Sequence, residues 1–381
     1  PYSTIMGGRV SEAETIWKAT EIAELVVIES QSRLESKAFA AAAILNNGGH
    51  TDNVIVVENR DLYDQLVNGG MRYVIITTIV ANHQLAVAKG HSVIYCVGPR
   101  DNYVDDHIVL PEIDRNVFIS SLKESGLNDD EVKKLALDSA KDINILWRML
   151  GVVMTPPAWD TDATIMKFIP IMLVGRWDEA RDADRQLLKE LSGSESYEAY
   201  RREINAIILA DESPLKKIGT VFVVKSLYAL YKRYFRYVTD VDIDRFLEYA
   251  DVALEDVDKD AIAKMESQEL QYWRANRMFS SDLRKGIVEG LALISIMQED
   301  TGRDKTIERW LSAKLKEFDL QKYLSHRRNM QWIAEASPKS FLEFIENDIK
   351  KRSHILNEII VIRPNRCGLT DTQIFYTELI F

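Results

Sequence analysis

Short apolar runs alternate with amphipathic segments over the first hundred residues. The runs are rich in β-branched residues and lack a regular change between apolar and polar positions, so they predict strands buried on both faces. They span residues 25–30, 53–58, 73–80 and 91–99. The segments around them predict helices, at residues 12–24, 33–47, 60–70 and 81–90. This alternation predicts a doubly wound α/β module with a parallel sheet over residues 1–110.

The pattern changes to helical spacing after residue 110. From Val132 to Leu150 the apolar residues repeat every three or four positions, which predicts one helix with a single apolar face. Asn128 or Asp129 can cap its start and Gly151 can end it. We therefore expect a helical lid over residues 111–155. The stretch TPPAW at 155–159 marks a boundary, because two prolines resist helix continuation.

Nearly all of the remaining chain has the pattern of amphipathic helices. Residues 156–260 predict a helical domain, in which 219–224 has the pattern of a short strand, as in a winged-helix module. Residues 261–381 predict a helical-repeat region of irregular period. The fold class that follows is an α/β doubly wound parallel sheet with a larger all-α, repeat-like region after it.

Charge and apolar-run length restrict the classes of partner. The 381-residue chain is too long for one ordinary core, and its net charge of −11 argues against a surface dedicated to nucleic acid or to an anionic membrane. This net charge is still compatible with a local basic patch. The longest apolar runs, such as KFIPIMLVG, reach about half of the ~20 residues that a membrane-spanning helix needs.

The cysteines and the chain ends add two further expectations. Cys96 and Cys367 are far apart and have no metal-ligand spacing, which favours a reducing, cytoplasmic location. The chain starts at Pro1 and stops in the apolar run IFYTELIF. Both ends predict a segment of a longer protein, truncated in its C-terminal helical region.

The turn after the first expected strand is the place for a phosphate-binding loop. It reads VVIESQSRLESKAFAAA, with Lys37 where a phosphate-binding lysine would stand. Gln31 and Ser36 take the glycine positions and Ala38 takes the hydroxyl position, and side chains there crowd a loop that needs φ > 0. An ordinary surface lysine on a helix is the competing interpretation of Lys37.

The next two strands end in residues that suit a magnesium site and a phosphate sensor. Glu58 ends the second strand and is a candidate magnesium ligand, but Asn59 follows it and cannot act as a base at neutral pH. Thr77 and Thr78 end the third strand. Threonine is also common in strands because of its propensity, so a purely structural role for this pair stays open.

The order of these elements resembles the central part of a STAND-class NTPase, the NB-ARC and NACHT-like branch of the AAA+ superfamily. The lid segment LPEIDRNVFISSL matches the family pattern at four apolar positions: Leu110, Ile113, Phe118 and Leu122. The chain departs at Ile79, where the family has an arginine, and at KDINIL, where it has a Gly-x-Pro-Leu-like turn. The resemblance covers roughly residues 20–155.

The resemblance implies a nucleotide site with a degenerate phosphate loop. ATP or ADP with Mg²⁺ would meet Ser36 and Lys37 at the phosphates and Glu58 at the metal. Thr77 or Thr78 would meet the terminal phosphate. The missing glycines argue against efficient hydrolysis, so no catalytic residue is assigned and a degenerate NTPase is expected.

Two functional hypotheses follow. In the first, the chain is a regulatory or sensor segment of a larger STAND-like signalling protein, whose helical region recognises a protein partner and drives assembly, including homo-oligomers. Bacterial proteins of this class often act in antiphage defence, so the resemblance implies that role too. In the second, the chain is a non-enzymatic helical-repeat scaffold for protein–protein interaction, with a dead NTPase fold used for packing.

Overall fold

The computed structural model describes most of the chain as two compact units. The described residues are 2–47, 51–99, 101, 106–152, 155–255, 278–319, 322–323, 326 and 329–350. Unit 1 is formed by Pro1–Ala158 together with Leu209–Ser213. Unit 2 is formed by Trp159–Ile208 and Pro214–Phe381. The terminal run IFYTELIF and Cys367 lie outside the described residues.

Unit 1 contains a five-stranded, all-parallel sheet, which confirms the predicted α/β fold class. Its strands are β1 (Leu25–Glu29), β2 (Val54–Val57), β3 (Val74–Thr77), β4 (Ser92–Val97) and β5 (Ile108–Val109). Their order is β2-β3-β4-β1-β5. The two-residue strand β5 was not predicted, because so short a pairing leaves no periodicity in the sequence. β1 therefore lies inside the sheet, between β4 and β5.

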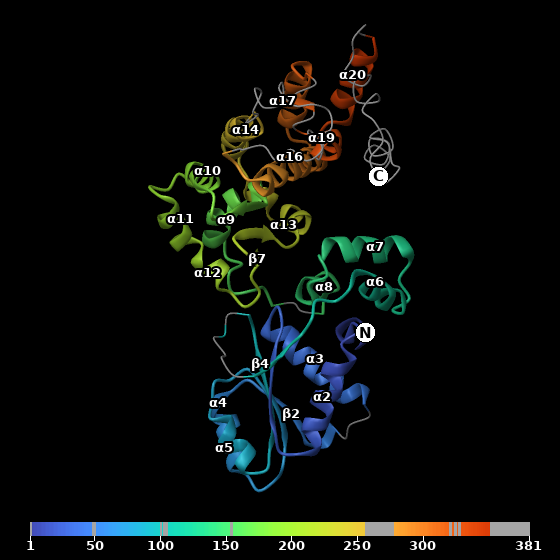
Figure 1. Cartoon of the computed structure of the whole chain (residues 1–381), viewed down its shortest axis with the longest axis vertical. Coiled ribbons are helices and arrows are strands. Elements are labelled where there is room, and N and C mark those ends of the chain that lie inside the picture. Colours follow the sequence, from blue (N-terminus) through green and yellow to red (C-terminus); the bar gives the residue numbers. More distant parts are fainter. Residues whose placement is uncertain are drawn as a thin grey trace, which may run out of the picture. The chain divides into compact units, whose positions relative to one another are not determined.

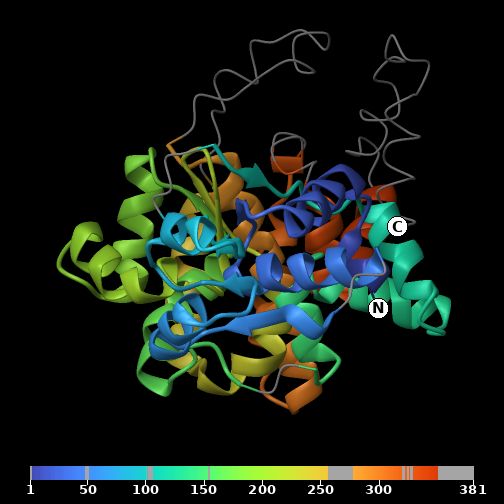
Figure 2. The same ribbon diagram turned by 90° about the horizontal axis from the view of Figure 1, so that it is seen from below.

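Helices cover both faces of this sheet, as Figures 1 and 2 show for the blue part of the chain. The helices are α1 (Tyr2–Met6), α2 (Val10–Glu21), α3 (Arg33–Asn46), α4 (Arg60–Asn68) and α5 (His83–Ala88). Ile76 and Ile94 face the core with α2 and α3, whereas Ile75 and Val93 face α4 and α5. Because successive residues of a strand point to opposite faces, burial on both sides explains the unbroken apolar runs.

His83, at the start of α5, is buried among aromatic side chains. Its ring is 7% exposed, Nδ1 lies 2.8 Å from the Tyr63 hydroxyl, and its centroid lies 4.5 Å from that of Tyr95. Burial, with a smaller contribution from the positive charge of Arg60, lowers the pKa of His83 to about 4. The folded chain therefore keeps this imidazole neutral at pH values where an exposed histidine binds a proton.

We expect unit 1 to lose stability as pH falls from about 6.5 to about 4, because only the unfolded chain protonates His83 in that window. After a discount for solvent screening, the loss attributable to this residue is about 2 kcal/mol. Urea unfolding at several pH values measures it. His83→Gln keeps a hydrogen-bond acceptor for Tyr63 but does not titrate, so its free energy of unfolding should fall less over this range. Equal pH slopes for both chains would contradict the prediction.

Residues 111–155, expected to form a helical lid, contain three helices in unit 1, α6 (Arg115–Lys123), α7 (Asp129–Asp138) and α8 (Ile143–Met149). The prediction of one helix from Asn128 to Gly151 is wrong. Ala140 and Lys141 have φ of 50° and 62°, which interrupts the helix between α7 and α8. The Asp142 side chain accepts hydrogen bonds from the amides of Asn144 and Ile145 and so starts α8 anew. The cap at Asn128 is confirmed as a capping box.

The apolar residues of the lid still share one core despite this break. Phe118 and Leu122 of α6 pack with Val132 of α7 and with Ile143 and Leu146 of α8. The break therefore turns the apolar face of α8 back toward the same cluster.

Unit 2 is mainly helical, as predicted. Its helices are α9 (Asp162–Val174), α10 (Asp182–Ser192), α11 (Tyr197–Glu203), α12 (Asn205–Ile208), α13 (Leu227–Tyr234), α14 (Asp240–Leu254), α16 (Ser281–Thr301), α17 (Thr306–Lys316), α19 (Met330–Ala336) and α20 (Pro338–Ile349). None of the described helices of the chain has both the length and the apolar character needed to cross a bilayer.

Unit 2 also contains a three-stranded antiparallel sheet in the order β6-β8-β7. The strands are β6 (Arg176–Asp178), β7 (Leu215–Ile218) and β8 (Val221–Val224). The expected short strand at 219–224 corresponds to β8, whereas β6 and β7 were not predicted within a region expected to be all helical. Strands of three and four residues carry too few alternating positions to stand out from helical periodicity.

Candidate functional site

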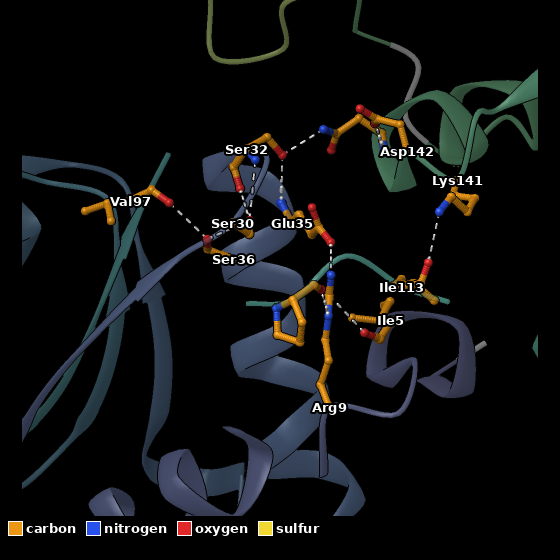
Figure 3. A network of polar contacts seen from close by, with 12 residues as sticks. Ile5, Arg9, Ser30, Ser32, Glu35, Ser36, Val97, Ile113, Lys141 and Asp142 are labelled. Carbon is orange, nitrogen blue, oxygen red and sulfur yellow. Dashed lines mark hydrogen bonds and ion pairs between the residues drawn. The ribbon is translucent and has the colours of Figure 1, made fainter. Parts of the chain in front are cut away.

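The turn from β1 into α3 is closed by its own side chains. It stands at the carboxyl end of β1, where the sequence predicts a phosphate loop. The Ser30 hydroxyl donates to the Ser32 carbonyl at 2.7 Å and accepts from the Ser32 amide at 3.4 Å. Ser30 is 5% exposed and Ser32 is fully buried. The turn is therefore a compact serine-lined connection held by short-range hydrogen bonds (Figure 3).

The amides at the start of α3 also have protein partners. The Glu35 amide donates to the Ser32 hydroxyl at 3.1 Å, and the Asn144 side-chain amide of α8 donates to the same oxygen at 2.7 Å. The Arg33 amide donates to the Asp211 carboxylate at 2.9 Å. In a phosphate-binding loop such amides point at the ligand. Here carboxylate and hydroxyl oxygens of the chain itself take that place.

Ser36, a predicted phosphate ligand, faces the interior of unit 1. It is fully buried, its hydroxyl donates to the Val97 carbonyl at 3.0 Å, and it lies 2.8 Å from the Ser30 hydroxyl (Figure 3). These contacts fasten the first turn of α3 to the end of β4. The side chain therefore has a structural role in this conformation, which the sequence did not indicate.

Lys37 and Glu58 lie together, although they come from different elements. The Lys37 ammonium group forms an ion pair with the Glu58 carboxylate at the end of β2. The Lys37 side chain is 19% exposed and that of Glu58 is 62% exposed. The carboxyl ends of parallel strands meet at one edge of a sheet, which brings this lysine and this acid within reach. In this conformation the lysine neutralises the carboxylate that was expected to hold magnesium.

The two threonines have different environments. Thr77 is fully buried, and its hydroxyl donates to the Val57 carbonyl at 2.8 Å and accepts from the Ile79 amide at 3.1 Å. It therefore joins the ends of β3 and β2. Thr78 is half-buried just beyond β3. Asn59 caps α4 by accepting from the Leu62 amide at 3.0 Å, which gives it a structural role.

Arg33 and Asp101 form an ion pair that the sequence did not indicate. The Asp101 carboxylate accepts from Arg33 Nε at 2.8 Å and from the Gly98 amide at 2.8 Å. The hydrogen bond from Arg33 lowers the pKa of Asp101, and the same bond raises the pKa of Arg33. Arg33 is thus held at the carboxyl edge with its backbone on Asp211 and its side chain on Asp101.

A buried ion pair joins the first turn of α3 to the loop before α2. Arg9 Nη2 lies 2.8 Å from Glu35 Oε1, and Arg9 Nε donates to the Pro111 carbonyl at 2.8 Å (Figure 3). The two side chains are 2% and 5% exposed. Arg9 therefore ties the loop before α2, the first turn of α3 and the segment after β5 together. No sequence pattern indicated this pair, because its partners are 26 residues apart and share no motif.

Together these contacts describe a site that is occupied by the chain itself. Among the described residues, no group of three or more His, Cys, Asp or Glu side chains is placed to hold a metal ion, so the role of Glu58 as a magnesium ligand stays a prediction. No family model matches the chain, and none of the curated proteins matches it.

Proposed function

We propose that this chain is a regulatory segment of a larger STAND-like signalling protein, in which unit 1 is a closed nucleotide-type module that does not hydrolyse ATP efficiently. Unit 2 would recognise a protein partner through its helices, and the chain would work in the cytoplasm. The observation that carries the proposal is the start of α3, where the amides of Ser32, Arg33 and Glu35 donate to oxygens of the chain.

A phosphate bound at the start of α3 would have to compete with acidic groups of the chain itself. A phosphate at the start of α3 would have to displace the Asp211 carboxylate, which already makes a charge-assisted hydrogen bond there. It would also have to break the Lys37–Glu58 pair to engage the lysine. The two groups that a nucleotide phosphate would contact, the Arg33 amide and the Lys37 ammonium group, therefore already bind carboxylates of the chain. A phosphate would have to compete with these carboxylates.

The helical part supports partner recognition by analogy alone. α16 packs against α17 and α19, and α20 packs against α19 and α17, so these four helices lie side by side as helices do in helical-repeat arrays. Such arrays offer extended surfaces that bind other proteins.

The proposal predicts that the chain does not bind ATP or ADP with micromolar affinity in the presence of Mg²⁺ and does not turn ATP over. Calorimetric titration and a phosphate-release assay measure these two properties. Lys37→Ala is the diagnostic variant, and Lys18→Ala, an exposed lysine of α2, is the matched control. Micromolar binding that is lost in Lys37→Ala and kept in Lys18→Ala would establish a nucleotide site and contradict the proposal.

The second candidate is a non-enzymatic scaffold, which the Lys37–Glu58 pair also favours because it removes the lysine from phosphate binding. The two functions differ in the effect expected when the Asp211 contact at the start of α3 is lost. In a regulatory segment, Asp211→Ala should change the assembly state of the chain, and the sedimentation coefficient measures this. A scaffold should sediment identically with and without that substitution.

A further inference from the structure

The segment Leu209–Ser213 is set apart from its neighbours in the chain. The elements on either side, α12 (Asn205–Ile208) and β7 (Leu215–Ile218), belong to unit 2, whereas these five residues pack with unit 1. We call this segment the strap. Because the chain is continuous, a movement of α12 or of β7 pulls on the strap that joins them.

Two acidic residues anchor the strap at separate places in unit 1. Asp211 accepts a hydrogen bond from the Arg33 amide at the start of α3, at 2.9 Å. Glu212 forms an ion pair with Arg148 of α8, and the two side chains are 22% and 17% exposed. Since α3 and α8 are themselves joined through Asn144 and Ser32, both anchors act on one connected set of contacts.

The Asp211 carboxylate lies against Gly98, which has no side chain to displace it. A Cβ atom added to Gly98 would lie 2.9 Å from Asp211 Oδ1, and its next nearest neighbours would be ordinary contacts with Arg33 at 3.7 Å. The positive charge of the Arg33 side chain, held nearby by Asp101, attracts the carboxylate as well. The carboxylate therefore sits between a helix start, a positive side chain and a position without a Cβ.

We propose that the strap is a conformational latch, which closes the start of α3 through Asp211 and Glu212 and can be released as one piece. The contact of Asp211 is a charge-assisted hydrogen bond to a backbone amide, and that of Glu212 is a partly exposed ion pair. Neither contact lies in the apolar core of unit 1, so both can break while that core stays folded. Release would uncover the start of α3 in response to movement of α12 or β7. The latch rests on the contacts above, and only its link to partner recognition rests on the proposed function.

Hydrogen exchange of the full chain, followed by mass spectrometry, tests the latch. Asp211→Ala removes the first anchor, Glu212→Ala removes the second, and Gly98→Ala displaces the Asp211 carboxylate without changing any charge. Glu195→Gln, an exposed carboxylate between α10 and α11, is the matched control. The two reporting peptides cover residues 31–36 and 209–213, and a peptide covering β4 reports whether unit 1 stays folded.

Each of the three strap variants should raise exchange in both reporting peptides by at least about tenfold, the effect of losing one charge-assisted hydrogen bond. The β4 peptide and the Glu195→Gln chain should exchange as the native chain does. The Glu212→Ala result is decisive, because Glu212 contacts α8 and not α3, so a strap that opens as one piece carries its loss to the Arg33 amide. If Glu212→Ala leaves peptide 31–36 unchanged, the two contacts are independent and the latch is refuted. The exchange result tests the latch alone, whereas the nucleotide titration tests the proposed function alone.

Discussion

Replacing Gly286 by alanine is expected to cost unit 2 at least about 3 kcal/mol of stability, at or beyond the upper end of ordinary overpacking. Gly286 lies in α16, where it packs against the end of α9. A Cβ atom at this position would lie 1.9 Å from the Val174 carbonyl oxygen and 2.9 Å from the Arg176 amide nitrogen. These atoms are backbone, so they cannot rotate away, and the two elements must separate.

Gly290→Ala should act in the same direction, because its Cβ would lie 2.2 Å from the Leu173 carbonyl oxygen. The two glycines are four residues apart and therefore share one face of α16. Helix propensity alone makes the opposite prediction, since alanine favours a helix by about 1 kcal/mol over glycine. The sign of the change thus decides between close packing and propensity.

Urea unfolding, with exchange of the α16 amides as a second readout, measures the effect on unit 2. Glu299→Ala, an exposed position on the same helix, is the matched control and should change the free energy of unfolding by less than about 0.5 kcal/mol. A Gly286→Ala chain as stable as the native one would show that α9 and α16 do not meet this closely.

Replacing Arg9 by methionine is expected to destabilise unit 1 by about 3–5 kcal/mol. The substitution keeps a long apolar side chain against Phe39, but it leaves the Glu35 carboxylate buried without its positive partner. It also removes the hydrogen bond to the Pro111 carbonyl. An unpaired buried charge costs much more than a lost surface contact, because water cannot replace the missing partner.

The double variant Arg9→Met/Glu35→Leu tests this cause, since it removes both charges and should recover most of the lost stability. Arg60→Met is the surface control. Arg60 pairs with Asp64 at 3.0 Å, but both side chains are about half exposed, so its loss should cost at most about 1 kcal/mol. If the double variant unfolds as easily as Arg9→Met alone, the buried charge is not the source of the loss.

Local pattern was enough for β1 to β4 and α2 to α5 of unit 1 and for the class of its fold. Strands that are buried on both faces need unbroken apolar runs, and helices between them need apolar residues at helical spacing, so both are visible in short windows. The cap at Asn128 follows the same logic, because a capping side chain acts on amides two or three residues away. The helix break at Ala140 and Lys141 could not be predicted in this way, since alanine and lysine rarely adopt a positive φ.

The candidate site was only half visible in the sequence. The pairing of Lys37 with Glu58 follows from elements that end at one edge of a parallel sheet, so position along the chain was sufficient to bring them together. The groups that close the turn come from far away. Asp211 is 178 residues from Arg33, and Asn144 is 112 residues from Ser32. No local pattern can indicate which distant carboxylate or amide will reach a given helix start.

By itself, the sequence determined where β1 to β4 and α2 to α5 of unit 1 lie and that their sheet is parallel. Burial on both faces gives each of these strands an unbroken apolar run, and the helices between them have apolar residues at helical spacing. The tertiary structure alone decided what Ser36, Thr77 and Gly286 do. A hydroxyl becomes a ligand or a structural donor according to the carbonyl that it meets, and a glycine becomes essential only when another backbone passes within 2 Å of its missing side chain. Both outcomes depend on contacts between residues that the chain order does not place together.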